Sequence, residues 1–361
     1  MPIPSAPSIA IVGVTGAVGQ EFLSILEERR FPHSEIRMLA SARSAGSTVN
    51  FGGRAHTVQE LTEDSFDGVD LALFSAGKAV SRHFGPMAVR AGAVVVDNSS
   101  CFRMDPDVPL VTPEVNGDVL ERIVGPAIIA NPNCSTIIAL VAVTPLHRAV
   151  GVERMVVSTY QAASGAGAAA MRELEQQARD WSAGRPLDTP IFGRQYLFNV
   201  FSHNSAVGPE GYNEEEMKLL KETRKMWADD AIRVTATCVR VPVLRAHCES
   251  INLTFRRPLD EQEARRILAN APGVAMVDDR TKNAFPEPID ASGRDDVLVG
   301  RIRGDMSQPK GMGLDLFVAG DQIRKGAALN AVQIAERLLQ GKGSRHRGIA
   351  ASRGAGTSGW R

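Results

Sequence analysis

The sequence has little cysteine, and its four cysteines, Cys101, Cys134, Cys238 and Cys248, are widely spaced. No two of them form a C-x-x-C pair, so neither a zinc knuckle nor a redox dithiol is expected, and no metal site is predicted. Four cysteines in 361 residues are also too few for a disulfide framework. This favours a reducing, cytoplasmic location.

Long hydrophobic runs and an excess of one charge are also absent. The longest apolar stretches, such as residues 135–143, are too short to cross a bilayer, which takes about 20 residues. The opening residues MPIPSAPS have no basic region and no apolar core, so no export signal is expected. Lys+Arg and Asp+Glu both number 41, and this balance argues against a large basic surface for nucleic acid or an anionic membrane.

What the chain does contain is enough apolar sequence for a full core, at 43% apolar and 23% charged residues. Its length suggests two domains. In the first part, strand-like segments alternate with helical spacing. The expected strands are residues 8–14, 35–41, 69–77 and 91–100, and the expected helices are 17–31 and 81–91. This order predicts an α/β fold with a parallel, Rossmann-type sheet.

From about residue 152 the segments become longer, β-rich and half-polar, as in strands with one wet face. Expected strands are 152–162, 233–243 and 247–258, and expected helices are 167–184 and 213–227. We therefore predict a cofactor-binding domain at 1–133, joined by a late helix at about 322–340, and an α+β catalytic and dimerisation domain at 134–321. Residues 341–361, rich in Gly and Ser with five Lys/Arg and no acid, are expected to form a disordered tail. Five dispersed charges are a weak footprint for a nucleic-acid arm.

Glycines mark the junction between the first strand and the first helix. Gly13, Gly16 and Gly19 form G-x-x-G-x-x-G, a variant of the dinucleotide-binding fingerprint. Glycines let the backbone approach a pyrophosphate, and the helix that follows offers free N–H groups and a positive dipole end. The turn predicts a dinucleotide cofactor. The segment from Ser75 to Gly77 ends a further strand and is a second candidate contact.

The end of the second strand indicates which dinucleotide is bound. NAD-binding chains usually place an acid there for the ribose 2′-OH. Here Ser41, Arg43 and Ser44 stand instead, and an arginine with hydroxyls suits a 2′-phosphate. The prediction is NADP, with a solvated loop arginine as the alternative.

The segment NPNCST places Cys134 near an expected helix start, with Asn133 before it. A thiolate there would be stabilised by the helix dipole and by unpaired N–H groups, which lowers the thiol pKa. The same N–H groups could bind an oxyanion. A small buried residue at a packed helix start is an equally good interpretation of Cys134 by itself, and the cofactor motif upstream favours the nucleophile.

Taken together, the motifs resemble the aspartate-β-semialdehyde dehydrogenase family. The resemblance is carried by GVTGAVG, ASARSAG, DNSSCFRM, NPNCSTI, YQAASGAG, YNEEEMK, RVPVLRAHCESI and QIRKGAALNAVQIAE, in order from about residue 9 to residue 337. It implies a glyceraldehyde-3-phosphate dehydrogenase-like architecture and a homodimer. The implied reaction is the NADP-dependent reductive dephosphorylation of 4-aspartyl phosphate to L-aspartate 4-semialdehyde, in the biosynthesis of lysine (by way of diaminopimelate), threonine, methionine and isoleucine.

The resemblance also implies a role for individual residues. Cys134 would be the acyl-thioester nucleophile, with Asn133 beside it, and His247 would be the general acid/base. Gln161 would orient the substrate, Arg240 would bind its α-carboxylate, and Glu215 would bind its α-amino group. Arg103 and Lys218 would hold phosphate. Cofactor contacts would include Thr15, Gly16, Ala17, Val18, Arg43, Ser44, Ser164, Gly165 and Gln322, the last in a motif that departs from the common pattern.

The residues themselves leave alternatives open. Glu215 and Lys218, spaced i, i+3, suit one pocket but also a surface salt bridge. His247 alone is compatible with a structural histidine, and Cys101, Cys238 and Cys248 are interpreted as structural. The rival functions are reduction of N-acetyl-γ-glutamyl phosphate, which would share the fold, cofactor and thiol, and a non-catalytic dinucleotide-binding relative.

Overall fold

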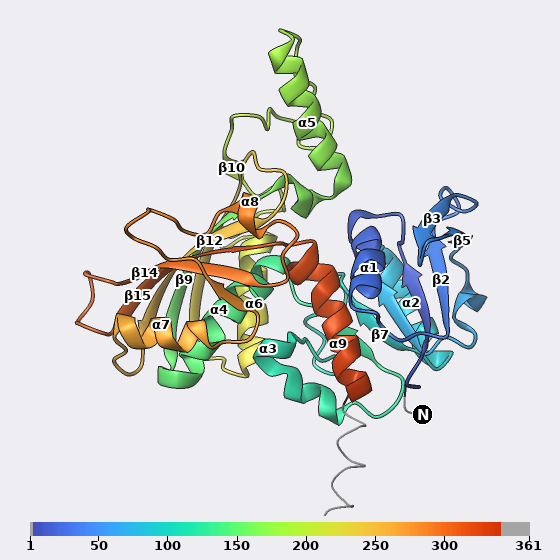
Figure 1. The fold of residues 1–361 in the computed structure, drawn as a ribbon, viewed down its shortest axis with the longest axis horizontal. Coiled ribbons are helices and arrows are strands. Elements are labelled where there is room, and N and C mark those ends of the chain that lie inside the picture. Colours follow the sequence, from blue (N-terminus) through green and yellow to red (C-terminus); the bar gives the residue numbers. More distant parts are fainter. Residues whose placement is uncertain (1–2, 341–361) are drawn as a thin grey trace, which may run out of the picture.

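The computed structural model describes residues 3–340, which form two large sheets with helices packed against them, and one small two-stranded sheet (Figure 1). The tail expected at 341–361 lies outside the described residues. The α/β fold class is confirmed, with an N-terminal parallel sheet and a second, mixed-sheet domain.

The first sheet has the strand order β5-β2-β1-β6-β7-β8, and all its neighbours are parallel. Its strands are β1 (Ser8–Val12), β2 (Glu35–Ala40), β5 (Gln59–Glu60), β6 (Leu71–Phe74), β7 (Val94–Asp97) and β8 (Ile128–Ala130). A small antiparallel hairpin, β3 (Thr48–Phe51) with β4 (Arg54–Thr57), stands beside it.

Successive side chains of β1 point to opposite faces of this sheet, and each face has its own apolar cluster. Ile9 and Ile11 pack with helix α1 (Ala17–Glu28) and with the C-terminal helix α9 (Leu329–Gln340). Ala10 and Val12 pack on the other face, with helix α2 (Lys78–Arg90). Helix α9, the last helix that the structure describes, therefore lies on the first domain.

The second sheet has the order β10-β11-β9-β12-β15-β14-β13. Its strands are β9 (Val152–Gln161), β10 (Phe201–Ser202), β11 (Arg233–Arg240), β12 (His247–Phe255), β13 (Val274–Met276), β14 (Val297–Gly304) and β15 (Gly313–Gly320). Pairs β9–β11 and β13–β14 are parallel and the others are antiparallel.

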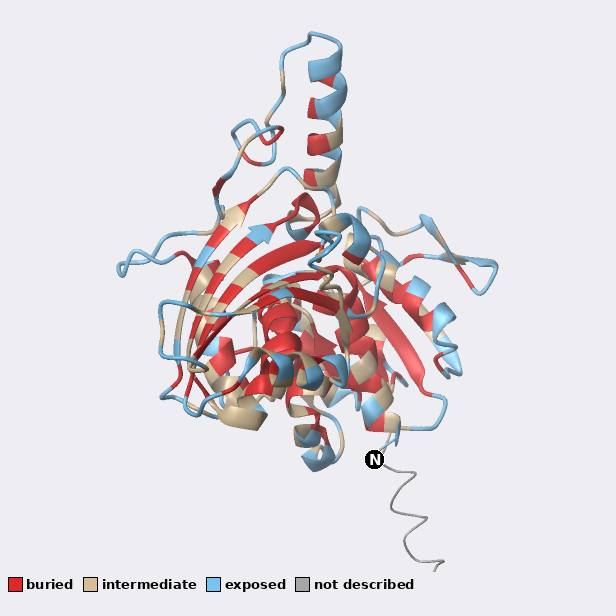
Figure 2. Cartoon of the chain, turned by 60° about the vertical axis from the view of Figure 1, so that its left-hand side comes forward, coloured by how far each residue is buried: buried red, intermediate tan, exposed pale blue. Residues whose placement is uncertain are grey.

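One face of this sheet is covered by helices α4 (Cys134–Val150), α6 (Glu214–Trp227) and α7 (Glu261–Ala269), which share a continuous apolar cluster with it. Helix α5 (Ala168–Ser182) instead projects from the body of the molecule, with one buried edge and mostly exposed residues around it (Figure 2). The shorter elements are η1 (Glu63–Phe66), α3 (Pro113–Asn116), η2 (Gly117–Arg122), η3 (Ala163–Ala166), α8 (Pro288–Ala291) and the π-helical turn η4 (Arg324–Ala328).

Two features are missing from the part of the chain that the structure describes. No helix between residues 3 and 340 is long and apolar enough to cross a membrane. Within the same range, no group of three or more His, Cys, Asp or Glu side chains is arranged to hold a metal ion.

The turn after β1 requires glycine at two positions. Gly13 has φ +88°, and a Cβ atom on it would lie 2.6 Å from the carbonyl oxygen of Ser75. A Cβ atom on Gly19 would lie 2.3 Å from the carbonyl oxygen of Gly13. The glycine spacing thus lets α1 pack directly on the turn and lets the turn touch the loop after β6.

Replacing Gly13 with alanine should lower the free energy of unfolding by about 3 kcal/mol, because a left-handed alanine costs roughly 1–2 kcal/mol and the clash with Ser75 adds to it. Gly46→Ala is the matched control, since Gly46 has φ +81° but no atom within 4 Å of the added Cβ. Urea denaturation measures both. Equal losses in the two variants would show that the close approach to Ser75 contributes nothing.

Candidate active site

The first domain presents two loops at the carboxyl ends of adjacent strands. Strand β1 lies between β2 and β6, so the chain leaves it to one side and later returns on the other, which is the switch point where open parallel sheets bind ligands. The loops after β1 and β6 meet there, at Gly13 and Ser75. Gly16 caps α1 without a side-chain hydrogen bond, which leaves the first N–H groups of the helix available to an anion.

These loops fit the predicted dinucleotide. Thr15 and Gly16 are exposed, Ala17 and Val18 are half-buried, and Gly77, with φ +89°, caps α2 in the neighbouring loop. Ser41 and Ser44 form a turn directly after β2, where Ser44 N donates to Ser41 O over 2.8 Å. Arg43 in this turn is exposed, and its side chain makes no hydrogen bond or ion pair with another described residue.

Cys134 is the first residue of α4, as the sequence predicts, and Asn133 is the N-cap. The Asn133 side-chain oxygen accepts hydrogen bonds from the N–H groups of Ser135 (3.0 Å) and Thr136 (3.3 Å). The helix therefore begins at a residue with a favourable capping side chain. It also means that two of the helix-start donors expected to serve the sulfur are already used by Asn133.

The expected low pKa of Cys134 is wrong. Burial raises the pKa of the thiol to about 12, and the negative charge of Glu215 raises it further, against the lowering effects of Arg103, Lys218 and Arg240. Desolvation disfavours the thiolate, and the capped helix start offers it little compensation. The thiol is thus protonated near neutral pH, although the four charged residues predicted to act with it do surround it.

Glu215 joins three elements of the site. Its buried carboxylate accepts hydrogen bonds from Asn133 Nδ2 (2.9 Å), Gln161 Nε2 (3.2 Å) and Lys218 Nζ (2.9 Å). Burial raises the pKa of Glu215, but the charge of Lys218 and the hydrogen bonds from Lys218 and Asn133 outweigh it and hold the pKa below its usual value. The Glu215–Lys218 pair is therefore a part-buried pair inside the site rather than a surface salt bridge.

Arg103 is buried, and its guanidinium donates to Glu222 Oε1 (3.1 Å) and to Asn98 O (2.8 Å). Glu222 also accepts the backbone N–H of Asn133 over 2.6 Å. Its second oxygen thus ties α6 to the residue before the thiol. Glu222 was not predicted from the sequence, although it lies seven residues after Glu215 on the same helix, a spacing that returns to the same face.

Arg240 and His247 approach the site from β11 and β12. Arg240 is buried and donates to Ala162 O (3.2 Å) and His203 Nε2 (2.8 Å). His247 Nδ1 accepts the N–H of Ala162 over 3.0 Å, and its Nε2 is buried without a partner. A Cβ atom on Gly165 would lie within 2.9 Å of both side chains, so Gly165 leaves them room.

Burial lowers the pKa of His247 to about 3, and the charge of Arg240 lowers it further. The ring is therefore neutral. Because Nδ1 accepts a hydrogen bond from a backbone N–H, the single proton of the neutral ring lies on Nε2.

Ser164 and Gln322 are placed together between the domains. Gln322 Nε2 donates to Ser164 Oγ, and Gln322 Oε1 accepts the N–H of Ala246 over 2.9 Å. Both polar atoms of Gln322 thus have protein partners, and its role as a cofactor contact stays a prediction. Close by, a Cβ atom on Gly326 would lie 2.8 Å from Cys134 Cβ, so η4 packs against the thiol residue.

Two further polar residues behind the thiol were not foreseen. Ser135 Oγ accepts a hydrogen bond from Gln161 Nε2 over 3.0 Å. Glu249, two residues after His247 on β12, is fully buried, and burial raises its pKa well above the usual value. The sequence could have indicated Glu249, because it lies two residues after His247, and residues i and i+2 of a strand lie on the same face.

Family models match both domains of the chain. A semialdehyde dehydrogenase NAD binding domain matches residues 8–123, and a semialdehyde dehydrogenase dimerisation domain matches residues 143–325. Together these two matches cover most of the chain. They define the class of protein as a two-domain semialdehyde dehydrogenase, an oxidoreductase that uses a nicotinamide dinucleotide.

Individual relatives narrow the class. The chain is 53% identical over 338 residues to aspartate-semialdehyde dehydrogenase of Synechocystis sp., covering 94% of this chain and 99% of the relative. It is 49% identical to that of Aquifex aeolicus, covering 92% and 98%. The solved structure of aspartate semialdehyde dehydrogenase II from Vibrio cholerae, complexed with ASA, has 44% identity and a TM-score of 0.89, covering 93% of this chain and 99% of that one.

A second solved structure, aspartate semialdehyde dehydrogenase with NADP from Candida albicans, has 25% identity and a TM-score of 0.73, covering 94% and 99%. The chain belongs to the aspartate-semialdehyde dehydrogenase family, as the resemblance predicted.

The charge of Glu215 should control the thiol. Glu215→Gln removes the negative charge that raises the pKa of Cys134, so this pKa should fall. Alkylation of Cys134 by iodoacetamide at about pH 8 should then become several-fold faster, as followed by mass spectrometry. Glu214→Gln, which alters an exposed neighbour on the same helix, should leave the rate unchanged. A slower reaction in the Glu215 variant would contradict this account of the thiol.

Proposed function

We propose that the protein catalyses the NADPH-dependent reduction of 4-aspartyl phosphate to L-aspartate 4-semialdehyde and phosphate, through a thioester on Cys134. The observation that carries the proposal is the set of charges around this thiol. Arg103, Lys218 and Arg240 supply three cations and Glu215 supplies one anion. A dianionic phosphate, a carboxylate and an ammonium group on one small substrate would match that set.

Each charged residue has a place in this scheme. Arg240 offers a rigid fork to the α-carboxylate, and Arg103 and Lys218 face the phosphate. Glu215 receives the α-amino group, which distinguishes the aspartyl compound from N-acetyl-γ-glutamyl phosphate, whose amine is acylated and uncharged. The names of the relatives favour the same substrate. The product would enter lysine, threonine, methionine and isoleucine biosynthesis.

In the first step the sulfur of Cys134 attacks the acyl carbon, and the C–O bond to phosphate breaks. The thiol proton leaves with the phosphate, so that an acyl phosphate dianion and a thiol give a thioester and hydrogen phosphate. Arg103 and Lys218 stabilise the departing anion, and Gln161 orients the acyl group. Dividing the reaction at a covalent thioester replaces one difficult step with two easier ones.

NADPH, when bound, supplies the hydride that reduces the thioester. His247 holds its Nε2–H toward the oxygen that gains negative charge at the reacting carbon, because Nδ1 is occupied by the Ala162 N–H. Of the expected general acid and general base roles, His247 therefore takes the acid role, as the donor to this oxygen. Cleavage of the C–S bond then releases the aldehyde and leaves the thiolate of Cys134, which takes up a proton from the solvent.

NADP rather than NAD is proposed for the cofactor. The loops after β1 and β6 fit a pyrophosphate, as described above, and no acid follows β2. Arg43 is exposed beside Ser44 with its guanidinium unpaired among the described residues, which suits a 2′-phosphate. The four cysteines, all free, are consistent with the cytoplasmic location expected from the sequence.

We also propose a homodimer formed through the second sheet. The face opposite α4, α6 and α7 carries Tyr160, 39% exposed, with Phe317 beside it at a centroid distance of 6.0 Å. Ala291 of α8 packs in one apolar cluster with Cys248 on this face. The match to a dimerisation domain over residues 143–325 supports a second copy as the partner.

Turnover should depend on the sulfur of Cys134. Cys134→Ala should lower the rate of NADP reduction with aspartate semialdehyde and phosphate by about 10⁴-fold or more, because the proposed thioester forms on this sulfur. NADP binding, measured by calorimetry, should be nearly unchanged. Cys101→Ala is the control and should keep full activity. Substantial dehydrogenase activity in the Cys134 variant, or faster turnover of N-acetylglutamate semialdehyde by the wild type, would refute the proposal.

Cofactor preference should depend on Arg43. Arg43→Asp should raise the KM for NADP by about tenfold or more, because the carboxylate repels a 2′-phosphate, and should improve use of NAD, whose ribose hydroxyl it can accept. Arg54→Asp makes the same charge change on an exposed residue of the β3–β4 hairpin and should leave both KM values alone. Equal effects on the two cofactors would show that Arg43 does not contact the 2′ position.

A further inference from the structure

The backbone immediately before His247 is in an unfavourable conformation. Ala246 has φ +70°, in the left-handed region that costs energy for any residue with a Cβ atom. It is fully buried, and its N–H donates to Gln322 Oε1. A strained backbone conformation of this kind persists only where surrounding contacts hold it. Here the left-handed residue lies directly before His247, the first residue of β12, and so fixes where that strand begins.

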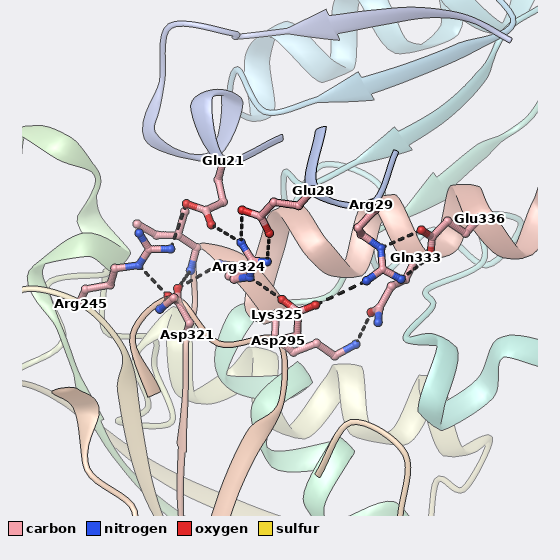
Figure 3. Close-up of polar contacts among 12 residues, drawn as sticks. Glu21, Glu28, Arg29, Arg245, Asp295, Asp321, Arg324, Lys325, Gln333 and Glu336 are labelled. Carbon is pink, nitrogen blue, oxygen red and sulfur yellow. Dashed lines mark hydrogen bonds and ion pairs between the residues drawn. The ribbon is translucent and has the colours of Figure 1, made fainter. Parts of the chain in front are cut away.

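Arg245 provides the contacts that hold this turn from its other side. Its Nε donates to Asp321 Oδ2 over 2.6 Å, and its Nη2 donates to Glu21 Oε2 over 2.9 Å. Asp321 is fully buried and also accepts the N–H groups of Gly293 (2.6 Å) and Arg324 (3.0 Å). Figure 3 shows the Arg245 guanidinium lying between the two carboxylates.

Glu21 connects this turn to the first domain. It lies on α1, the helix that begins at the glycine loop, and its Oε1 accepts a second arginine, Arg324 Nη1, over 3.2 Å. Arg324 in turn contacts Glu28 and Asp295 (Figure 3). The dinucleotide-binding helix and the strand that starts with His247 thus share one ion-pair network, and a planar guanidinium is needed to reach both carboxylates at once.

We propose that Arg245 is a positioning residue for the reaction. Held between Asp321 and Glu21, it fixes the left-handed turn at Ala246 so that His247 faces the reacting carbon, and it joins this turn to the helix of the cofactor loop. The inference rests on the role proposed for His247, and nothing in it requires Arg245 to touch substrate.

The test uses the full chain in the phosphate- and NADP-dependent assay. Arg245→Gln should lower kcat about tenfold with a small change in the KM for phosphate, because displacement of a positioned group slows chemistry more than binding. Adding Ala246→Gly should restore most of the lost kcat, because glycine adopts φ near +70° without the network. If Arg245 only stabilised the contact between the domains, Arg245→Gln would lower the unfolding temperature. Adding Ala246→Gly would then not restore kcat.

Arg29→Gln is the matched control. Arg29 has a similar exposure, 31% against 28% for the Arg245 side chain, and it pairs with Glu336 and Asp295 at the same face without reaching the turn. It should leave kcat unchanged. An equal fall in the Arg29 variant, an unchanged kcat in Arg245→Gln, or no rescue by glycine would overturn the proposal.

Two further variants keep the outcome interpretable. If Arg245→Gln does not fold, Arg245→Lys replaces it, since lysine keeps the charge but lacks the planar guanidinium. The kcat of Arg245→Lys should be several-fold lower than that of the wild type, and adding Ala246→Gly should restore most of it. His247→Ala separates the two levels of inference. Full turnover in that variant would refute the proposed role of His247, whereas loss of turnover there with a normal Arg245 variant would refute only the positioning role.

Discussion

The buried carboxylate of Glu215 is the group on which the candidate site depends. It receives donors from the cap of α4, from the end of β9 and from α6, and so brings Asn133, Gln161 and Lys218 to one point. A buried charge is costly unless it is paired and hydrogen-bonded, and all three donors serve that purpose. The same charge raises the pKa of Cys134. In the proposed function a substrate ammonium group would neutralise it, which would couple ionisation of the thiol to occupancy of the site.

A short segment from Asp321 through η4 is one of the connections between the two domains at this site. Gln322 contacts Ser164 and the turn before His247, and Gly326 packs on Cys134. Lys325 is fully buried and donates to both oxygens of Glu114 over 2.8 Å. Because the contacts of this segment reach α1, α3, α4 and η3, it holds the helix after the glycine turn and the thiol residue together.

The parts of the site that the sequence could predict are those with local causes. The glycine turn after β1 was predictable because the need for glycine arises from the turn itself and the helix beside it. Asn133 as the start of α4 was predictable because capping depends on neighbours two and three residues away. The network of Arg245, Asp321 and Glu21 was not, because its members are far apart in the chain. Strands β13, β14 and β15 were also missed.

The sequence by itself determined the chemistry that is available: a thiol at a helix start, a dinucleotide turn, and a set of charged residues in family order. Only the tertiary structure decided the protonation states of that chemistry. It placed the half-buried Cys134 near the carboxylate of Glu215, and it set the proton of His247 on Nε2 through Ala162. The reason is physical, since pKa values and tautomers depend on desolvation and on charges brought near by folding, and neither can be read from the residues adjacent in the chain.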